Sequence, residues 1–363
     1  MVSLPEKDCV GCASCANICP VNAISMQPDD EGFLYPVLNK EICINCDECS
    51  NHCPVISGIA DDYNNSKEPL AVYSGWSLDE ETRLTSSSGG IFTELAKSVL
   101  KQGGYVVAVT YTEEHTAKHV IINSIAELEE LKRSKYLQSD IGDIYQQIKH
   151  LLEKSEKVLF VGTPCQCAGL LAFLESKPDN LILVDFICHG VNSPLVHQRY
   201  ILEVEQELKI KVKQINHRDK CLGWDDYLFS VSDSQKYYLG NKRQNPFLRG
   251  FLTDAYLRQT CFKCSFKGQT RPVDLTLGDC WGYQKDKGMG VSLIIVQSEI
   301  GEKLLLEING NIYKEDYNMS LIQENNPSLI VSASNKYKLR EKFFEVWEKE
   351  NSLLKTIEKF LGE

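Results

Sequence analysis

Eight of the 15 cysteines in this 363-residue chain lie within its first 53 residues, where one spacing occurs twice. The segments from Cys9 to Pro20 and from Cys43 to Pro54 both read C-x2-C-x2-C-x3-C-P. Three cysteines at two-residue gaps let a tight loop wrap one face of a metal centre, while the fourth cysteine reaches across to the partner centre. The two segments should therefore interlock, and residues 1–57 are predicted to form one small domain.

The repeated spacing matches that of bacterial ferredoxins with two 4Fe-4S clusters. In that pattern each segment gives three ligands to one cluster and its fourth to the other, so the two sets are Cys9, Cys12, Cys15 and Cys53, and Cys43, Cys46, Cys49 and Cys19. Zinc knuckles also use C-x2-C pairs, but here four cysteines occur twice with a proline after each fourth. Two clusters without an open coordination position serve one-electron transfer, which implies a redox partner.

Charge and hydropathy exclude several function classes. The formal net charge of -11 leaves no excess of Lys and Arg to neutralise phosphates, so nucleic acid is not an expected partner. The first residues, MVSLPEKD, lack the basic and apolar regions of a secretory signal. No run of about 18 apolar residues predicts a membrane span, although peripheral association stays open. The sequence therefore predicts a cytoplasmic protein, in which spaced cysteines bind metals more often than they form disulfides.

A polar stretch from Ser57 to Pro69 separates the cysteine-rich segment from the rest of the chain. Beyond it, β-branched runs at residues 105–111, 157–162 and 180–186 alternate with amphipathic stretches of helical period, the last at residues 336–350. The predicted fold class is therefore mixed α/β or α+β, with a larger mixed α/β domain over residues 70–310. Residues 311–363 are predicted to be its C-terminal helical extension.

Four patches of the larger domain carry chemically useful groups. SSSGG at residues 86–90 precedes a helical pattern and suits an anion, although a plain N-cap explains it as well. SKYLQS at residues 134–139 combines a cation, a phenol and an amide, as a surface turn also would. GTPCQCAGL at residues 162–170, like the later FICHGVNSP, follows an apolar strand, where ligand sites of α/β sheets gather. Residues 261–282 hold a C-x2-C pair that alone would favour zinc.

Taken in this order, the patches resemble the beta-subunit family of coenzyme F420 hydrogenases and dehydrogenases. The resemblance covers about residues 70 to 305 and runs through SSSGG, SKYLQS, VLFVGTPCQ, ICHGVNSP, HRDKCLGW, the C-x2-C pair, RPVDLTLGDCWG and GVSLIIV. The order of the two parts, a two-cluster segment followed by such a domain, resembles that of the F420H2 dehydrogenase input subunit. The family implies a flavoprotein that binds FAD, often with a further 4Fe-4S cluster beside the flavin. Flavin accepts two electrons and releases them singly, as clusters require.

The matching motifs imply the residues of the flavin site. Those expected against FAD are Ser87, Ser88, Gly89, Gly90, Ser134, Lys135, Tyr136, Gln138, Ser139, Thr163 and Pro164. Lys135 would favour the anionic reduced flavin, and it is one of two catalytic candidates. The other is His189, which is equally well explained as a structural histidine. Asp274 and Asp279 could orient Arg271 and the ring edge, or cap a turn.

The same motifs imply a third 4Fe-4S cluster on the four cysteines Cys165, Cys188, Cys261 and Cys264. Zinc on these thiols is one alternative, and a redox pair of Cys165 and Cys167 is another. The remaining cysteines, Cys167, Cys221 and Cys280, are not expected to bind metal.

The sequence thus predicts an FAD-dependent iron-sulfur oxidoreductase. It would pass electrons between a hydride donor or acceptor at FAD, either coenzyme F420 or another organic molecule, and clusters linked to ferredoxin or a partner redox protein. The alternative is a noncatalytic electron-transfer subunit of a larger redox complex. Neither the direction of electron flow nor the oligomeric state is encoded in these motifs.

Overall fold

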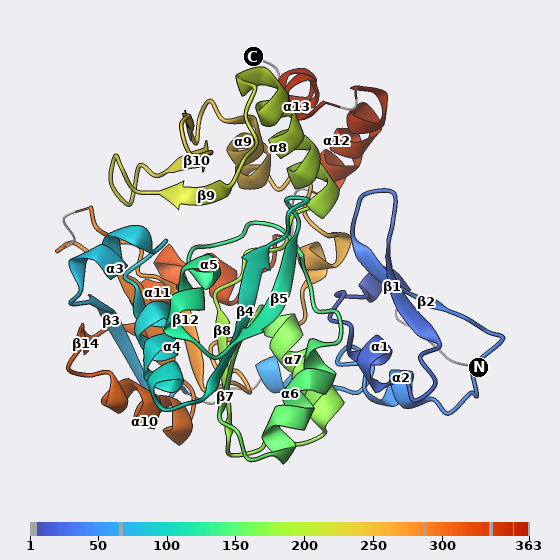
Figure 1. Ribbon diagram of the computed structural model, residues 1–363, viewed down its shortest axis with the longest axis vertical. Coiled ribbons are helices and arrows are strands. Elements are labelled where there is room, and N and C mark those ends of the chain that lie inside the picture. Colours follow the sequence, from blue (N-terminus) through green and yellow to red (C-terminus); the bar gives the residue numbers. More distant parts are fainter. Residues whose placement is uncertain (1–5, 65–67, 286–287, 334–336, 351, 362–363) are drawn as a thin grey trace.

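The computed structural model describes residues 6–64, 68–285, 288–333, 337–350 and 352–361. Its largest element is a nine-stranded mixed sheet with the order β14-β3-β13-β12-β8-β7-β4-β5-β6 (Figure 1). The strands are β3 (Ala71–Ser77), β4 (Tyr105–Tyr111), β5 (Ala117–Ile122), β6 (Ser139–Asp140), β7 (Val158–Val161), β8 (Leu181–Phe186), β12 (Leu275–Asp279), β13 (Ser292–Val296) and β14 (Ile312–Asp316).

The centre of the sheet is formed by the β-branched runs that the sequence marks as strands. These runs become β4, β7 and β8, which pair in parallel, and β12 joins β8 in the same direction. Most of their side chains are buried on both faces, as expected of a parallel sheet covered by helices. Because parallel strands end at the same edge, the loops that follow β7, β8 and β12 gather there.

Helices cover both faces of the sheet. Helices α4 (Ile91–Lys101), α5 (Leu128–Leu131) and α10 (Glu299–Glu307) pack on one face. In α4, Ile91, Leu95 and Val99 are spaced by four residues and bury one side of the helix. The other face carries α6 (Ile144–Glu153), α7 (Pro164–Leu174) and α11 (Met319–Asn325). Helix α3 (Glu80–Thr85) leads from β3 into the SSSGG turn.

A second layer, the upper layer, lies above the sheet in Figure 1. It combines a three-stranded antiparallel sheet of β9 (Gln214–Asp219), β10 (Leu228–Ser232) and β11 (Tyr237–Asn241) with α8 (Pro194–Leu208), α9 (Pro246–Leu252), α12 (Tyr337–Glu350) and α13 (Leu353–Leu361). The helix expected from residue 336 is α12, and Lys336 itself lies outside the described residues. Among the described residues, no helix combines the length and the apolar character needed to span a lipid bilayer.

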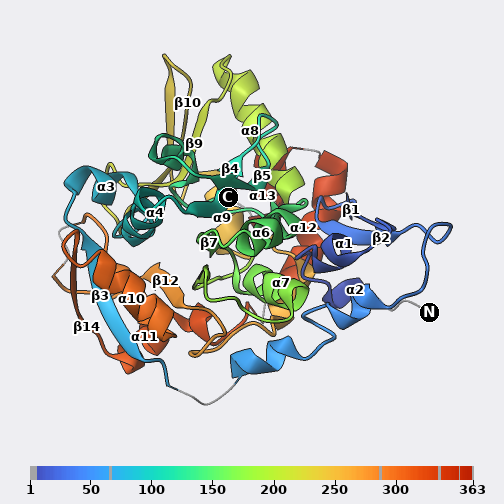
Figure 2. The same ribbon diagram turned by 60° about the horizontal axis from the view of Figure 1, so that its bottom comes forward.

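The N-terminal module is small and lies beside the sheet. It contains η1 (Glu6–Asp8), α1 (Ser14–Ile18), the antiparallel hairpin of β1 (Ile24–Pro28) and β2 (Leu34–Leu38), α2 (Glu48–Asn51) and η2 (Ile59–Asn64). Helix α1 packs against α6 and α7, which separate the module from the sheet (Figure 2). This arrangement, a small cysteine-rich module followed by a larger mixed α/β part, is the predicted fold class.

Two apolar side chains anchor the module in the cores of the rest of the chain. Ala13 packs among the side chains of α6, α7 and the sheet. Phe33, in the turn of the hairpin, is fully buried in the core of the upper layer. The adjacent Gly32 allows this approach, because a Cβ atom there would lie 2.4 Å from the Cβ of Leu195. The module is therefore docked onto both layers.

Replacing Phe33 with alanine should destabilise the protein by about 3–5 kcal/mol, because it removes a buried ring and leaves a cavity. Val37→Ala on the same hairpin is the matched control, since the side chain of Val37 is 51% exposed. Anaerobic denaturant unfolding measures both variants. Equal unfolding midpoints for the two variants would contradict the docking of the module through Phe33.

Candidate cofactor sites

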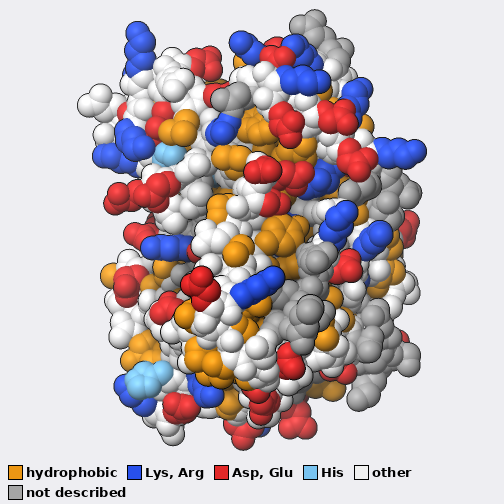
Figure 3. All heavy atoms as spheres, turned by 90° about the vertical axis from the view of Figure 1, so that its right-hand side faces the viewer, with side chains coloured by type: hydrophobic (Ala, Val, Ile, Leu, Met, Phe, Trp, Pro, Cys, Tyr) orange, Lys and Arg blue, Asp and Glu red, His pale blue; other side chains and the backbone are white. Residues whose placement is uncertain are grey.

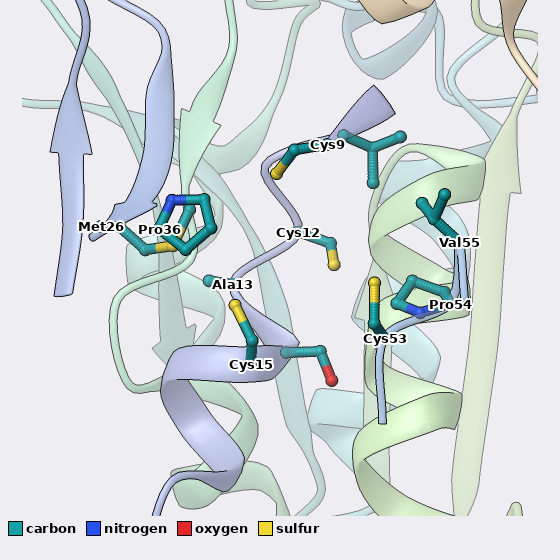
Figure 4. A pocket seen from close by; sticks show the side chains of 11 residues that line it. Cys9, Cys12, Ala13, Cys15, Met26, Pro36, Cys53, Pro54 and Val55 are labelled. Atoms are coloured by element: carbon teal, nitrogen blue, oxygen red, sulfur yellow. The ribbon is translucent and has the colours of Figure 1, made fainter. Parts of the chain in front are cut away.

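The first set of four predicted cysteines surrounds one enclosed space. The sulfur atoms of Cys9, Cys12, Cys15 and Cys53 face this space, and Met26, Pro36, Pro54 and Val55 close it with apolar side chains (Figure 4). Each of the four cysteines is at most 8% exposed. Burial, with the neighbouring thiols Cys9 and Cys53, raises the pKa of Cys15 to about 12. Such thiols become thiolates only when a cationic centre binds them.

The zinc alternative and the cluster differ in size. Zinc draws its sulfur ligands to about 2.3 Å from a single point. A cubane of four irons and four sulfides is wider, so its cysteines stand further apart. Among the described residues, no three His, Cys, Asp or Glu side chains are grouped closely enough to hold one metal ion.

The repeated spacing produces a repeated backbone. Gly11 and Asn45, each two residues after the first cysteine of a segment, have φ angles of 68° and 55°. Ala13 and Asp47, two residues further on, have φ angles of 61° and 60°. Both loops thus turn in the same way before a short helix. The sequence repeat is also a structural repeat, as two equivalent cluster loops require.

The second set lies nearer to solvent than the first. Cys49 is buried beside Cys15 and Ile24 and lies close enough to Cys46 for the two thiols to interact electrostatically. Cys46 is exposed and Cys43 is half-buried. The sulfur of Cys19 accepts a hydrogen bond from the backbone N–H of Ala23 at 3.2 Å. The two sets therefore adjoin through Cys15 and Cys49, and the second one faces outward.

The third set comes together from three separate segments. Cys165 lies in the first turn of α7, Cys188 follows β8, and Cys261 and Cys264 belong to the turn around η4 (Gln259–Lys263). Burial raises the pKa of Cys165 well above its usual range, and the other three thiols raise it further. The structure thus brings the four cysteines of the expected third set near one another, from segments far apart in the sequence.

Cationic side chains lie next to this third set. The buried ammonium of Lys267 donates to the carbonyls of Cys188 and Ser328. Burial raises the pKa of Cys188 to about 11, and the charges of Lys267 and Arg271 oppose that rise. Positive charge at this position stabilises thiolates and any anionic cluster that they bind.

The other three cysteines lie apart from the set. Cys167 points its thiol toward the carbonyls of Gly162 and Val184, at 3.9 and 3.8 Å. Cys280 is buried among the side chains that cover β13, and Cys221 is exposed.

Helix α7 connects the first and third sets. Cys165 and Gly169 are four residues apart on α7 and so lie on one face, about one 5.4 Å turn apart. Gly169 lies directly against Cys12: a Cβ atom on Gly169 would be 2.8 Å from the Cβ of Cys12 and 3.0 Å from its sulfur. Ala168, Tyr63 and other apolar side chains fill the space between the two sets. Cys12 of the first set and Cys165 and Cys264 of the third set therefore belong to, or pack against, one apolar cluster.

A buried arginine also joins the two sets. The guanidinium of Arg258 donates from Nε to the carbonyl of Cys9 at 2.9 Å and from Nη1 to Gln138 at 2.9 Å. Its Nη2 has no hydrogen-bond partner among the described residues. Burial raises the pKa of Cys261 to about 12, and the charge of Arg258 opposes that rise. Arg258 thus places a positive charge between the first and the third set.

A cavity of about 530 Å³ opens at the edge where β7, β8 and β12 end. The N-terminal residues of α4 and α7 both line it, so the positive ends of two helix dipoles face the cavity. Cys188 and His189 form part of its wall, so the third cysteine set adjoins the cavity. Eight residues expected against FAD also line it: Ser87, Ser88, Gly90, Ser134, Lys135, Tyr136, Ser139 and Thr163.

Three residues expected against FAD do not line the cavity. Gly89 donates its backbone N–H to the Ser292 hydroxyl, and a Cβ atom at this position would lie 2.5 Å from a carbonyl of β3. The side chain of Gln138 faces Arg258 and the N-terminal module. The carbonyl of Pro164 accepts a hydrogen bond from Tyr63. These three residues are next in sequence to residues that line the cavity, but they do not line it themselves.

The two catalytic candidates line the cavity, but the chain itself already engages their polar groups. The ammonium of Lys135 donates to the carbonyls of Glu130 and Lys132, and burial, with the charge of Arg133, lowers the pKa of Lys135 to about 7. The ring of His189 contacts Asp254 at 2.5 Å through Nε2 and Ser328 at 3.1 Å through Nδ1.

Comparison with known proteins gives the family of the chain. Models of the N-terminal and C-terminal parts of the coenzyme F420 hydrogenase/dehydrogenase beta subunit match residues 72–144 and 155–319. The chain belongs to this family. A 4Fe-4S dicluster domain model matches residues 8–56, so iron-sulfur electron transfer is the role of the N-terminal module. The resemblance that the motifs indicated is thereby confirmed.

One solved structure supports the fold. A chain of the F420-reducing NiFe hydrogenase complex from Methanosarcina barkeri aligns with 77% of this chain and 94% of its own length, at a TM-score of 0.52 and 15% identity. The likeness confirms the predicted fold class. No curated protein matches the chain.

Several cavity residues were missed by sequence reasoning. They are Arg218, Tyr227, Phe251 and the segment 325–328. Of the two roles left open for Asp274 and Asp279, the structure does not give the pairing with Arg271. Arg271 pairs with the buried Asp185 at 3.0 Å, whereas Asp279 pairs with Arg218 at 2.8 Å and Asp274 with Lys177 at 3.1 Å. Arg218 lies in the family-like motif HRDKCLGW, which was the available signal for it.

Gly169→Ala tests the contact between α7 and Cys12. Alanine normally favours a helix over glycine by about 1 kcal/mol, so the substitution would stabilise α7 if there were space. Because the new Cβ collides with Cys12, we expect the opposite: a less stable protein that has lost the iron of one cluster, about four atoms per chain.

Anaerobic iron analysis and thermal unfolding measure these effects. Gly310→Ala is the control, since no atom lies within 4 Å of a Cβ placed there. Full iron content in Gly169→Ala would refute the close approach of α7 to Cys12.

Proposed function

We propose that this chain is an FAD-dependent iron-sulfur oxidoreductase with three 4Fe-4S clusters. It would exchange electrons between an organic hydride donor or acceptor in the cavity and a redox partner protein at the N-terminal module. The observation that carries the proposal is the continuity of the three sites. Cys188 belongs both to the cavity wall and to the third cysteine set, which lies one turn of α7 from the first set.

The cavity has polar groups for the phosphates and ring oxygens of FAD and an apolar wall for its planar ring. The N-terminal amides of α4 and α7, together with Ser87, Ser88 and Thr163, suit the pyrophosphate and ring oxygens. Tyr136 and Phe251, stacked at 4.6 Å, give an aromatic wall for a planar ring. When bound, FAD converts between two-electron hydride chemistry and one-electron transfer. Coenzyme F420 is the candidate substrate that the family suggests, and another organic hydride carrier is the alternative.

The third cysteine set fits a further cluster beside this cavity. Cys165, Cys188, Cys261 and Cys264 supply four thiols, and Lys267 offsets their negative charge. Cys165 and Cys264 pack against the apolar cluster that contains Cys12, so the third set lies close to the first. Arg258 holds the carbonyl of Cys9 and so fixes the first loop relative to Cys261. Each of these groups acts on thiolates that a cluster would require.

The outward-facing second set provides the exit toward a partner. Ile42 and Ile44, next to Cys43, are 47% and 60% exposed. The face of the molecule that carries the N-terminal module shows apolar side chains lying between charged ones (Figure 3). Such a mixed surface near an accessible redox centre suits a transient encounter with a ferredoxin or with a subunit of a redox complex.

Cofactor content tests the proposal directly. Anaerobically purified protein should release FAD on denaturation and contain about twelve irons per chain, four for each of three clusters. About eight irons without flavin would contradict the proposal and favour a noncatalytic electron-transfer subunit. Bleaching of the flavin by NADH, NADPH, reduced coenzyme F420 or reduced ferredoxin then identifies the donor.

A pair of variants assigns the third cluster within the same experiment. Cys165→Ala should lose about one third of the iron while the N-terminal clusters remain. Cys167→Ala, two residues away on the same helix, should keep all of it because its thiol points toward Gly162 and Val184. Equal iron content in the two variants would show that the ligand assignment is wrong.

A further inference from the structure

Arg218 is a buried arginine at the cavity that the proposed function leaves without a role. It lies near the end of β9, and its side chain is only 4% exposed. Arg218 is nevertheless one of the residues that line the cavity. A buried guanidinium needs both a counter-charge and partners for its five N–H groups. The chain supplies the counter-charge for Arg218, but it supplies hydrogen-bond partners for only some of the five N–H groups.

The contacts of Arg218 use one edge of the guanidinium. Nη1 donates to Asp279 at 2.8 Å and to the hydroxyl of Tyr136 at 3.3 Å. Nε and Nη2 have no hydrogen-bond partner among the described residues. Buried donors without partners are rare, because each costs about 1–3 kcal/mol. Nε and Nη2 form the edge of arginine that binds carboxylate or phosphate through two parallel hydrogen bonds.

Aromatic side chains hold the guanidinium in place. Its central carbon lies 4.2 Å from the ring centre of Tyr227 and 5.1 Å from that of Trp281. Trp281 is in turn stacked on Trp224 at 4.5 Å. Arg218 is therefore rigid before any ligand arrives, which lowers the entropic cost of binding.

A second arginine at the cavity shows the contrast. Arg133 also lines the wall, but its Nη2 donates to Glu129 at 2.7 Å and its Nε to the carbonyl of Thr85 at 3.2 Å. Nε and Nη2 of Arg133 are thus bonded to the chain itself, whereas the same two groups of Arg218 have no partner among the described residues. Charge neutralisation by Asp279 does not remove this capacity, since Asp279 occupies only Nη1.

We propose that Arg218 binds an anionic oxygen group, a phosphate or a carboxylate, of a molecule in the cavity through Nε and Nη2. The inference rests on the proposed function in that the molecule is either the flavin nucleotide or the organic substrate. In the first case the group is a flavin phosphate, and in the second it is an anionic substituent of the substrate. Either way, Arg218 selects phosphorylated or carboxylated ligands over neutral ones.

Two binding measurements on the full chain distinguish the sources. The first titrates flavin-depleted protein with FAD, FMN and riboflavin and follows quenching of flavin fluorescence. The second measures binding of inorganic phosphate and of acetate by equilibrium dialysis, with and without FAD. The variants are Arg218→Gln and Arg218→Lys, which keeps the charge but not the two-donor edge. Arg199→Gln is the control, because Arg199 lies over the ring of Trp347 in the upper layer, outside the cavity.

If Arg218 binds a flavin phosphate, Arg218→Gln weakens FAD and FMN by about ten- to a hundredfold and leaves riboflavin unchanged. If it binds the substrate anion, FAD affinity is unchanged, and saturable binding of phosphate or acetate is lost in Arg218→Gln. Arg218→Lys should fall between the wild type and Arg218→Gln in either case, and Arg199→Gln should match the wild type.

Two outcomes overturn the inference. One is unchanged binding of flavins and anions in Arg218→Gln. The other is an equal loss of riboflavin and FAD binding, which would mean that Arg218 only supports the cavity wall. Failure of the wild type to bind any flavin contradicts the proposed function instead, and the dialysis measurement then still tests the anion site.

Discussion

The contact between Gly169 and Cys12 is the constraint on which the arrangement of the sites depends. It brings the N-terminal module to within one turn of the start of α7, where Cys165 lies. Only a glycine allows this approach, since any side chain would meet the Cβ atom of Cys12. The burial of Phe33 in the upper layer and the hydrogen bond from Arg258 to Cys9 hold the module in the same position. Two parts of the chain that are separate in sequence thus come into direct contact.

The parallel centre of the sheet determines where the cavity lies. The loops after β7, β8 and β12 meet at one edge, and they deliver Thr163, Cys188 and Asp279 to the cavity. Two helix N-termini and the partnerless N–H groups of Arg218 give that cavity groups that suit anionic oxygens, although the whole chain carries a net charge of -11. Local charge, placed by the fold, therefore decides what the cavity can bind.

The features that follow from the spacing of residues could be predicted from the sequence. The repeated cysteine segments predicted two equivalent loops, and the matched φ angles at Gly11 and Asn45 show why the spacing repeats. Sequence reasoning could not predict the roles of Gly169 and Arg258. Their partners Cys12 and Cys9 lie 157 and 249 residues away, and a single glycine or arginine has no spacing that signals such contacts. Gln138 was misassigned for a related reason, since its neighbours line the cavity while its own side chain turns toward Arg258.

The central claim is that the third cysteine set links the cavity to the N-terminal clusters. It is tested most directly by photoreducing the bound flavin with EDTA and light under anaerobic conditions, and following cluster reduction by rapid-freeze electron paramagnetic resonance. In the wild type, the N-terminal clusters should become reduced soon after the flavin. In Cys165→Ala, the flavin should become reduced while the N-terminal clusters stay oxidised far longer. Reduction of these clusters at the wild-type rate in Cys165→Ala would contradict the account.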